Sequence, residues 1–542
     1  MPNKTTTAGA GLAGFAHSVK SAWILLPLLA LAIIAIYSPS LRAPFIFDDQ
    51  GKIVENTDIR SLSDIGTKLV FRYRERKWES NDPSRPVTYL TFALNYHFGE
   101  LDPLGYHWVN LILHTLNTFL LFFLVRKILF YSYQKDHLFF PLAAAVLFAV
   151  HPINSVVVCY TYNRSGALAF FFFLSSILLF IRADNGRRFT VPLSILCFVI
   201  ALFSKPDAIT LPAVLLALDF IFLSDYDISK MAARGLSHLA FWTVLTAYLL
   251  FRYFYLGGLG DLEASNSLND WPRFLYLAVQ PYVIVKYLRL LLLPKGLCFE
   301  HSITQPGTLL QSKFAVSYLI LAGMALAGWL AYKRKTAGSK IILFAILWFL
   351  IILAPTSSLF PTTLPMEENR VYMSGLGFYL AAVLACHAFF KINLSAGGIP
   401  FYKRPSGLLM SALLGTYIFG LAAVTIKRSR LYREPALVWD EAHELYPLNV
   451  RATANASVAH NNLAVAYYQQ NKYDKALEEL QKAIVVDPNS AMAHDNLGRV
   501  LYERKDYPGA LREFETVLRL DPNNAFTRQN IALIRKAQQI KK

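Results

Sequence analysis

Long apolar stretches, separated by short polar connections, dominate the first 430 residues of the chain. A helix needs about 20 mostly apolar residues to cross a bilayer. The stretches approach or reach this length, so the pattern predicts a bundle of about eleven membrane-spanning helices. The predicted spans are Ala22–Tyr37, Val109–Tyr131, Phe139–Val158, Ser165–Ile181, Val191–Phe203, Ile209–Leu223, Leu236–Tyr255, Phe314–Tyr332, Ile341–Phe360, Val371–Phe390 and Leu408–Ile426.

One further apolar stretch, Trp271–Leu293, differs from the others. Pro272 and Pro281 interrupt it, and it also contains Lys286 and Arg289. Proline removes a backbone donor and disturbs a helix interior. The sequence therefore predicts a broken or re-entrant segment that makes no net crossing.

The last part of the chain contains a sequence repeat in place of long apolar stretches. Asp487-Pro488-Asn489 recurs as Asp521-Pro522-Asn523, 34 positions later, and the small and apolar positions recur in step with it. This is the tetratricopeptide pattern of paired antiparallel helices. We therefore predict a membrane domain at residues 1–430 and a repeat domain at 431–542. Within the repeat domain we expect repeats at about 457–490 and 491–524 and a capping helix at 525–542.

Composition agrees with a membrane protein, because 55% of residues are hydrophobic and only 16% are charged. Soluble domains carry about 25% charged residues. The net charge of +17 is better explained by loop bases that set topology than by nucleic-acid binding. The four cysteines lie far apart, mostly within apolar stretches, and lack metal-site spacing, so we expect packing residues.

Basic loop residues also predict the topology, since they favour the cytoplasmic side. Five basic clusters share one side if Trp271–Leu293 makes no crossing. The N-terminus is then cytoplasmic, and the loop at 38–106 and the repeats lie outside. Lys427, Arg428 and Arg430 conflict with this arrangement. The clusters are Arg126/Lys127/Lys135, Arg182/Arg187/Arg188, Lys230/Arg234, Lys333/Arg334/Lys335 and Lys391/Lys403/Arg404.

The candidate chemistry begins with Asp48 and Asp49, two adjacent acids just beyond the first predicted span. An ionised carboxylate at a membrane boundary is costly to hold unless its charge is used. A carboxylate there can take a proton from a hydroxyl nucleophile or orient a cation. A solvated capping or turn pair is the alternative. Chemistry is favoured because further polar motifs map to the same outer side.

Several of these motifs contain bases, which together could bind a lipid phosphate, although each base alone could be an interfacial anchor. His107, Asn110 and His114 share one helix face. A histidine metal site is possible there, and satisfied polar residues inside the bundle are the favoured alternative. The candidate donor-phosphate or substrate-binding residues are Arg85, His107, Arg164, Lys205, Arg370 and Tyr372.

The ordered set of motifs resembles the membrane proteins with tetratricopeptide repeats that act as protein O-mannosyltransferases, a group similar to GT-C glycosyltransferases. The resemblance covers nearly the whole chain. It departs from the expected pattern in Asn163-Arg164, where Gly-Arg is usual, and in its short repeat array. The motifs are Phe45–Asp49 with Ile53–Asn56, Ser84–Thr88, Gly105–Leu111, Ala149–Ile153 with Asn163–Ser165, Lys205–Thr210 and Glu368–Met373.

The resemblance implies a GT-C-type membrane bundle that transfers a sugar, mannose in the named group, from a polyprenyl-phosphate donor to an acceptor hydroxyl, expected to be protein Ser/Thr. Asp48 would be the preferred base of an inverting displacement, and Asp49 would assist. No cofactor is expected, although a divalent metal stays open. The short array suggests the inner membrane of a bacterium or archaeon, with the repeats outside and holding the acceptor.

The alternative of a different class is a non-catalytic scaffold, in which the membrane domain anchors repeats that recruit outer-face partners. Paired acids at a membrane boundary favour the enzyme, because an anchor has no use for such charge. No nucleotide-binding loop occurs in the sequence. A donor carried by a membrane lipid therefore fits better than a cytosolic nucleotide-sugar.

Overall fold

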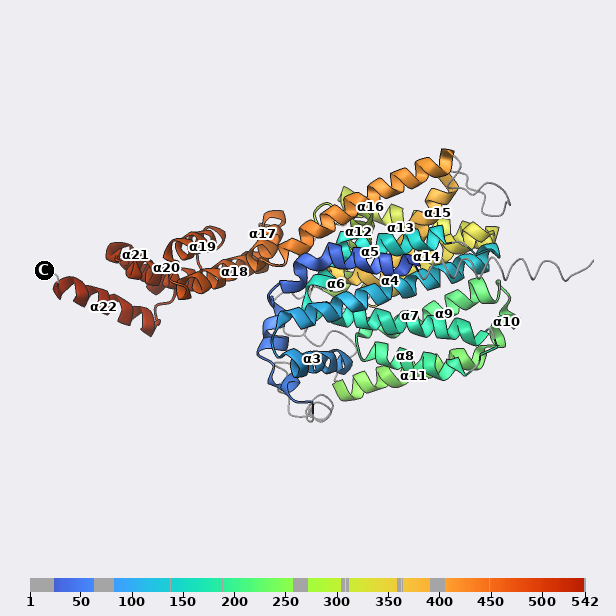
Figure 1. Cartoon of the computed structure of the whole chain (residues 1–542), viewed down its shortest axis with the longest axis horizontal. Coiled ribbons are helices and arrows are strands. Elements are labelled where there is room, and N and C mark those ends of the chain that lie inside the picture. Colours follow the sequence, from blue (N-terminus) through green and yellow to red (C-terminus); the bar gives the residue numbers. More distant parts are fainter. Residues whose placement is uncertain are drawn as a thin grey trace, which may run out of the picture. The chain divides into compact units, whose positions relative to one another are not determined.

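A computed structural model describes most of the 542-residue chain, and Figure 1 shows its helices. The described residues are 24–62, 82–136, 138–184, 186–187, 189–256, 272–303, 308, 311–357, 362, 364–389, 405–447 and 449–540. Regular structure within these ranges is helical, with no strand. The chain divides into two compact units. They are Met1–Leu297 with Ile303–Arg433, and Cys298–Ser302 with Glu434–Lys542.

The first unit is a bundle of apolar helices. Eight described helices are long and apolar enough to cross a membrane, or nine when one bent pair counts as a span. The predicted mainly α, multi-span class is therefore confirmed. The helices are Ile24–Arg42, α3 (Pro86–Gly99), α4 (Pro103–Tyr133), α5 (Phe139–Val150), α6 (Ser155–Cys159), α7 (Arg164–Asp184), α8 (Thr190–Leu202), α9 (Leu211–Leu218), α10 (Ile228–Ala232), α11 (Gly235–Phe251), α12 (Arg273–Leu292), α13 (Ser312–Arg334), α14 (Ala337–Leu353), α15 (Val371–Phe389) and α16 (Pro405–Leu431).

Two sequence predictions about these helices need correction. The predicted single span Phe139–Val158 is bent by 50° between Val150 and Pro152. His151 has an extended backbone there, as expected of a residue that precedes proline. The predicted span Ile341–Phe360 forms a shorter helix, since α14 has 17 residues, whereas α8 has 13 residues, as predicted for Val191–Phe203.

The stretch predicted to be broken is instead one continuous helix, α12, with Pro281 inside it. Its hydroxyl groups at Tyr276 and Tyr287 donate to the carbonyls of Thr356 (2.6 Å) and Glu367 (2.8 Å). Both acceptors belong to the connection between α14 and α15. Two tyrosines of α12 that are eleven positions apart therefore contact the same connection. Helix α12 is also one of the eight described helices that are long and apolar enough to cross a membrane.

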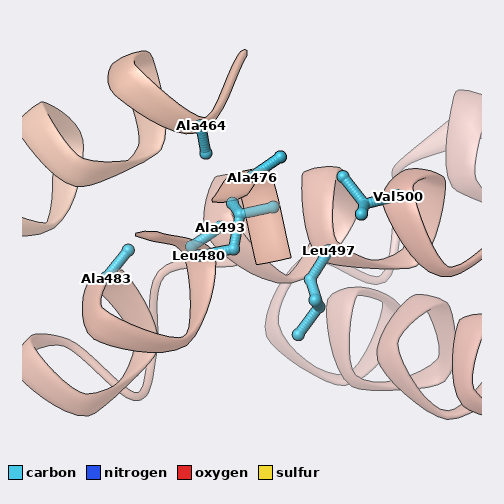
Figure 2. Close-up of a cluster of buried hydrophobic side chains, with 7 residues drawn as sticks. All are labelled: Ala464, Ala476, Leu480, Ala483, Ala493, Leu497 and Val500. Carbon is cyan, nitrogen blue, oxygen red and sulfur yellow. The ribbon is translucent and has the colours of Figure 1, made fainter. Parts of the chain in front are cut away.

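The second unit contains the predicted tetratricopeptide repeats. Its helices are α17 (Pro435–Leu445), α18 (Val450–Gln469), α19 (Tyr473–Val486), α20 (Ala491–Glu503), α21 (Tyr507–Leu520) and α22 (Ala525–Ile540). Figure 2 shows buried side chains where α18, α19 and α20 pack together, among them Ala464, Leu480 and Leu497. Packing of α18 on α19 and of α20 on α21 buries the apolar face of each pair.

At two contacting positions, the repeats differ in side-chain size: the second repeat has a smaller residue at one position and a larger residue at the other. Ala464 and Leu480 pack in the first pair, and Gly498 and Phe514 occupy the positions 34 residues later. A Cβ atom added at Gly498 would lie 2.7 Å from the Phe514 ring. Glycine is therefore required where the larger ring fills the space, since close-packed cores do not absorb an extra methyl group.

The segment Cys298–Ser302 also belongs to the second unit, although it lies between α12 and α13 in the sequence. Phe299 packs edge-on against Trp439, with ring centroids 5.1 Å apart. Glu300 is buried and pairs with Arg451 at 3.2 Å. This unit is therefore completed by a loop from an earlier part of the chain.

A buried histidine makes the stability of the repeat unit depend on pH. Burial opposes the charge on His460, but its contacts with Asp440 (3.0 Å) and Glu479 (2.7 Å) raise its pKa above the ordinary value of 6.5. A raised pKa contributes stability that is fully present below 6.5 and is lost as pH rises through the raised value. We expect amides of α18 and α19 to exchange hydrogen faster at pH 9 than at pH 6, after correction for intrinsic rates.

His460→Gln provides the control for that prediction. Glutamine can still donate to a carboxylate but does not titrate, so corrected exchange in α18 and α19 should no longer change across this range. Identical pH dependence in the variant and the original chain would contradict the assignment to His460.

Candidate functional site

Several connections between helices meet at one end of the first unit, which we call the loop face. The hydroxyl of Thr88 in α3 donates to the carbonyl of Ser204, which follows α8 (3.0 Å). The amide of Asn369, before α15, donates to the side-chain oxygen of Asn163, before α7 (3.2 Å). These bonds gather motifs that are up to 206 residues apart in the sequence.

The two acids on this face have different surroundings. Asp48 is half-buried, whereas Asp49 is 1% exposed. Phe47 precedes them with a backbone φ of 48°, in the left-handed region. This conformation is costly for a bulky residue and occurs where the surrounding structure imposes it, often at functional sites. The turn at Phe47 leads directly into the dyad.

Asp49 is held by the backbone. Its carboxylate accepts hydrogen bonds from the amides of Ile46 (3.1 Å) and Tyr162 (2.8 Å). Burial raises the pKa of Asp49 to about 8, against the opposing effect of these two bonds. Asp49 is therefore mostly protonated at neutral pH, and it ties the loop after the first helix to the start of α7.

Asp48 meets a tyrosine instead. The hydroxyl of Tyr160 donates to Oδ2 of Asp48 at 2.9 Å and accepts from the Asp48 amide at 3.2 Å. Because Asp49 is mostly neutral, Asp48 can carry a charge without strong repulsion from its neighbour. Of the two acids, Asp48 is the one suited to accept a proton from a substrate.

Three of the predicted phosphate-binding bases lie together on the loop face. Each is paired with a carboxylate: Arg85 with Asp82 (2.9 Å), Lys205 with Asp207 (2.9 Å) and Arg370 with Glu367 (2.5 Å). Asp207 also interacts electrostatically with both Arg85 and Arg370. The guanidinium of Arg85 lies over the ring of Tyr162, 5.7 Å from its centroid. Tyr162 therefore contacts both the dyad and the basic cluster.

Arg164 is not part of that cluster. It is 0% exposed, and all three of its side-chain nitrogens donate to protein groups. The acceptors lie in α3 and α4: Asn110 (2.8 Å), Asn95 (2.6 Å), Thr91 (3.2 Å) and the Tyr106 carbonyl (2.9 Å). The ring of Phe92 lies 4.7 Å from its guanidinium carbon. This arrangement joins α3, α4 and α7 and suits a positioning role.

His107 and Tyr372 also have interior surroundings. His107 contacts the Ala43 carbonyl through Nε2 at 3.0 Å, and thereby fixes the backbone that leads to the dyad. Tyr372 is 1% exposed and shares its hydroxyl with His114 (2.9 Å) and Asn117 (3.2 Å). In the described part of the chain, no three His, Cys, Asp or Glu side chains are grouped so that they could hold a metal ion.

The sequence analysis missed three residues of this site. Tyr160 and Tyr162 contact the dyad, and Asp82 pairs with Arg85. The two tyrosines lie within three residues of the Asn163-Arg164 motif, so their position beside a polar motif at the start of a predicted span was an available signal. Nothing in the spacing connects them with acids more than 110 positions earlier.

The chain is similar to known proteins over most of its length. A family model for the tetratricopeptide repeat matches residues 461–525. The human protein O-mannosyl-transferase TMTC3 is 25% identical over 496 residues, which cover 85% of this chain and 51% of that protein. The Caenorhabditis elegans protein O-mannosyl-transferase F38B6.6 is 26% identical over 475 residues, which cover 86% of this chain and 63% of that protein.

A shorter stretch is more similar to another relative. The Drosophila melanogaster protein O-mannosyl-transferase Tmtc1 is 34% identical over 191 residues, which cover 33% of this chain and 21% of that protein. The chain spans about half the length of the human relative. The predicted resemblance to repeat-bearing O-mannosyl-transferases is therefore confirmed at the level of overall similarity.

Proposed function

We propose that this protein is an inverting glycosyltransferase. It moves a sugar from a polyprenyl-phosphate donor to an acceptor hydroxyl, and the printed names of its relatives suggest mannose and a protein acceptor. The observation that carries the proposal is that the dyad with its half-buried Asp48 and the cluster of three bases share the loop face, where Tyr162 contacts both. A general base and a cationic site for a leaving phosphate are the two groups that this reaction needs.

In the proposed step, Asp48 accepts the proton of the acceptor hydroxyl as its oxygen attacks the anomeric carbon. The bond between that carbon and the phosphate oxygen breaks, and polyprenyl phosphate leaves with the electron pair. Arg85, Lys205 and Arg370 stabilise the leaving phosphate by sharing the donors that now contact Asp82, Asp207 and Glu367. Asp49, Arg164, His107 and Tyr372 position the loops around this centre.

A cavity inside the bundle supports a lipid-linked donor. It has a volume of about 320 Å³ and lies between α5, α15 and α16, beside the end of α12. Its walls are almost entirely apolar, formed by side chains such as Phe140, Leu147 and Met410. An apolar space of this kind within a membrane domain suits part of a prenyl chain.

Charge supports the proposed sidedness. Helices α4 and α7 begin at the loop face and carry Arg126, Lys127 and Arg182 near their other ends. Lysine and arginine favour the cytoplasmic side, so we place the loop face outside, in a cytoplasmic membrane. Of the three bases that conflict with this topology, Arg428 is buried and pairs with Glu368 (3.7 Å), so it does not act as a loop charge, whereas Lys427 and Arg430 are exposed and still conflict. The cluster Lys391/Lys403/Arg404 lies outside the described residues.

The first helices of the repeat pairs support binding of an extended acceptor peptide. Asn462, Asn496 and Asn530 recur every 34 residues, and one turn before each lies a partly or fully exposed apolar side chain: Val458, Met492 and Phe526. Helix α18 packs directly against α20. Neighbouring helices lie about 8–10 Å apart, close to the length of three extended residues. A side-chain amide can donate to and accept from a peptide backbone. The Asn496 amide already donates to Asn461 and accepts from Arg499, so the proposed peptide contacts are those of Asn462 and Asn530.

We expect Asn462→Ala together with Asn530→Ala to weaken binding of a neutral, Ser/Thr-rich fluorescent peptide about tenfold in the full chain, measured by anisotropy. N-methylation of the peptide backbone should weaken binding to the original chain similarly, because it removes the N–H groups from which the asparagine side-chain oxygens would accept hydrogen bonds. Asn523→Ala, an exposed asparagine before α22, is the matched control. Unchanged affinity in the double variant would contradict this surface.

The enzyme itself is tested by incubating the purified full chain with polyprenyl-phosphate mannose and with other polyprenyl-phosphate sugars. We expect a hexose on Ser or Thr of co-purified proteins or of an added peptide, detected by mass spectrometry, with the anomeric configuration opposite to that of the donor. Absence of transfer from every lipid-linked sugar, with the protein shown to be folded, would contradict the proposal.

A further inference from the structure

The short segment between α6 and α7 contacts both acids of the dyad. The Tyr160 side chain contacts Asp48, and the backbone amide of Tyr162 contacts Asp49. Tyr160 is 4% exposed, so its hydroxyl has little access to solvent. The two tyrosine rings lie 6.4 Å apart, and the second ring contacts Arg85. One segment of three residues therefore fixes the dyad relative to the basic cluster.

The hydrogen bonds at Tyr160 define where its single proton lies. The hydroxyl oxygen accepts from the Asp48 amide, so its own proton points to Oδ2 of Asp48. Burial and the neighbouring carboxylates raise the pKa of Tyr160 well above its ordinary value. The phenol therefore keeps its proton and remains a donor over the working range of pH. Such a donor favours the ionised form of the carboxylate that accepts from it.

We infer that Tyr160 is the positioning residue that orients the proposed base Asp48 and sets the pH at which this carboxylate loses its proton. The inference rests on the proposed function. Phe47 contributes because its left-handed backbone precedes the Asp48 amide, which donates to the same hydroxyl. The other titratable groups around the pair are Asp49 on the same loop and Tyr162 on the opposite segment.

Tyr160→Phe tests the inference, because it removes the donated proton and keeps the ring. We expect the acidic limb of the rate profile for sugar transfer to move to higher pH by about one unit, since one hydrogen bond to the charged form is lost. The plateau rate should fall about tenfold, with little change in KM for the lipid donor. Tyr318→Phe is the matched control, as its hydroxyl donates to the Ala278 carbonyl instead, and its profile should match the original.

A second variant keeps the hydroxyl and moves the profile the other way. Fluorotyrosine at position 160 is a stronger acid and a stronger donor, so the acidic limb should move to lower pH while the fold is retained. An unchanged acidic limb in both Tyr160 variants would overturn the inference. If the original chain transfers sugar and Asp48→Asn does not, that result leaves the proposed function standing; if the original chain transfers no sugar, the proposed function itself fails.

Discussion

Replacing Asp48 by asparagine is expected to reduce sugar transfer by about 100-fold or more, because a positioned general base contributes a factor of this size or greater. The fold should be retained, since asparagine has the same shape and its oxygen can still accept from the Tyr160 hydroxyl. Asp48 is also only half-buried. Initial rates with polyprenyl-phosphate mannose and thermal unfolding of the same preparations separate loss of chemistry from loss of structure.

Asp49→Asn is the matched comparison at the neighbouring position. Asp49 is mostly protonated at neutral pH because burial raises its pKa to about 8, so the variant removes little charge. Its amide oxygen can accept from only part of the pair formed by Ile46 and Tyr162. We expect a lower unfolding temperature and a much smaller loss of rate. An active Asp48→Asn variant would exclude Asp48 as the base, and an inactive Asp49→Asn variant would then point to its neighbour.

The adjacent acids could be located from the sequence, but their different surroundings could not. Adjacent acids after an apolar span are visible in one line of sequence, because charge near a membrane boundary is unusual. The difference between Asp48 and Asp49 depends on the left-handed turn at Phe47 and on contacts with Tyr160 and Tyr162. Those contacts bridge more than 110 residues, a distance that no local pattern encodes.

The helices likewise have some features that depend on local sequence and others that depend on contacts with distant parts of the chain. Hydropathy identifies the long apolar helices because a backbone in lipid must satisfy its own hydrogen bonds. It did not predict that α12 would continue through Pro281. Proline removes only one backbone donor, and the helix packs against α13 and α15, which can offset that loss. The bend at His151-Pro152 was not predicted either, although proline restricts the residue before it.

The bases show how similar motifs acquire different roles. Arg85, Lys205 and Arg370 lie together around Asp207, and their carboxylate partners were not foreseen. Arg164 looked equivalent in the sequence because it also begins a predicted span. Its acceptors come from α3 and α4 and become apparent only when the three helices are placed side by side.

Arg164→Met is therefore expected to be the most destabilising change on the loop face, with a loss of about 3 kcal/mol or more. Methionine fills part of the space but donates nothing, so Asn95, Asn110 and the Tyr106 carbonyl lose a partner inside the bundle. Buried acceptors without donors carry the cost of their desolvation. Denaturant unfolding of the detergent-solubilised chain, followed by fluorescence, measures this loss.

Arg85→Met is the comparison that distinguishes an effect on donor binding from an effect on stability. Arg85 is partly exposed and pairs with Asp82, so its replacement should change stability by about 1 kcal/mol or less. It should instead raise KM for the lipid-linked donor, because the proposed function places this cation at the donor phosphate. If Arg164→Met folded as well as the original chain and raised KM in the same way, Arg164 would be a phosphate ligand, as its sequence motif predicts, and its hydrogen bonds to α3 and α4 would have to open when the donor binds.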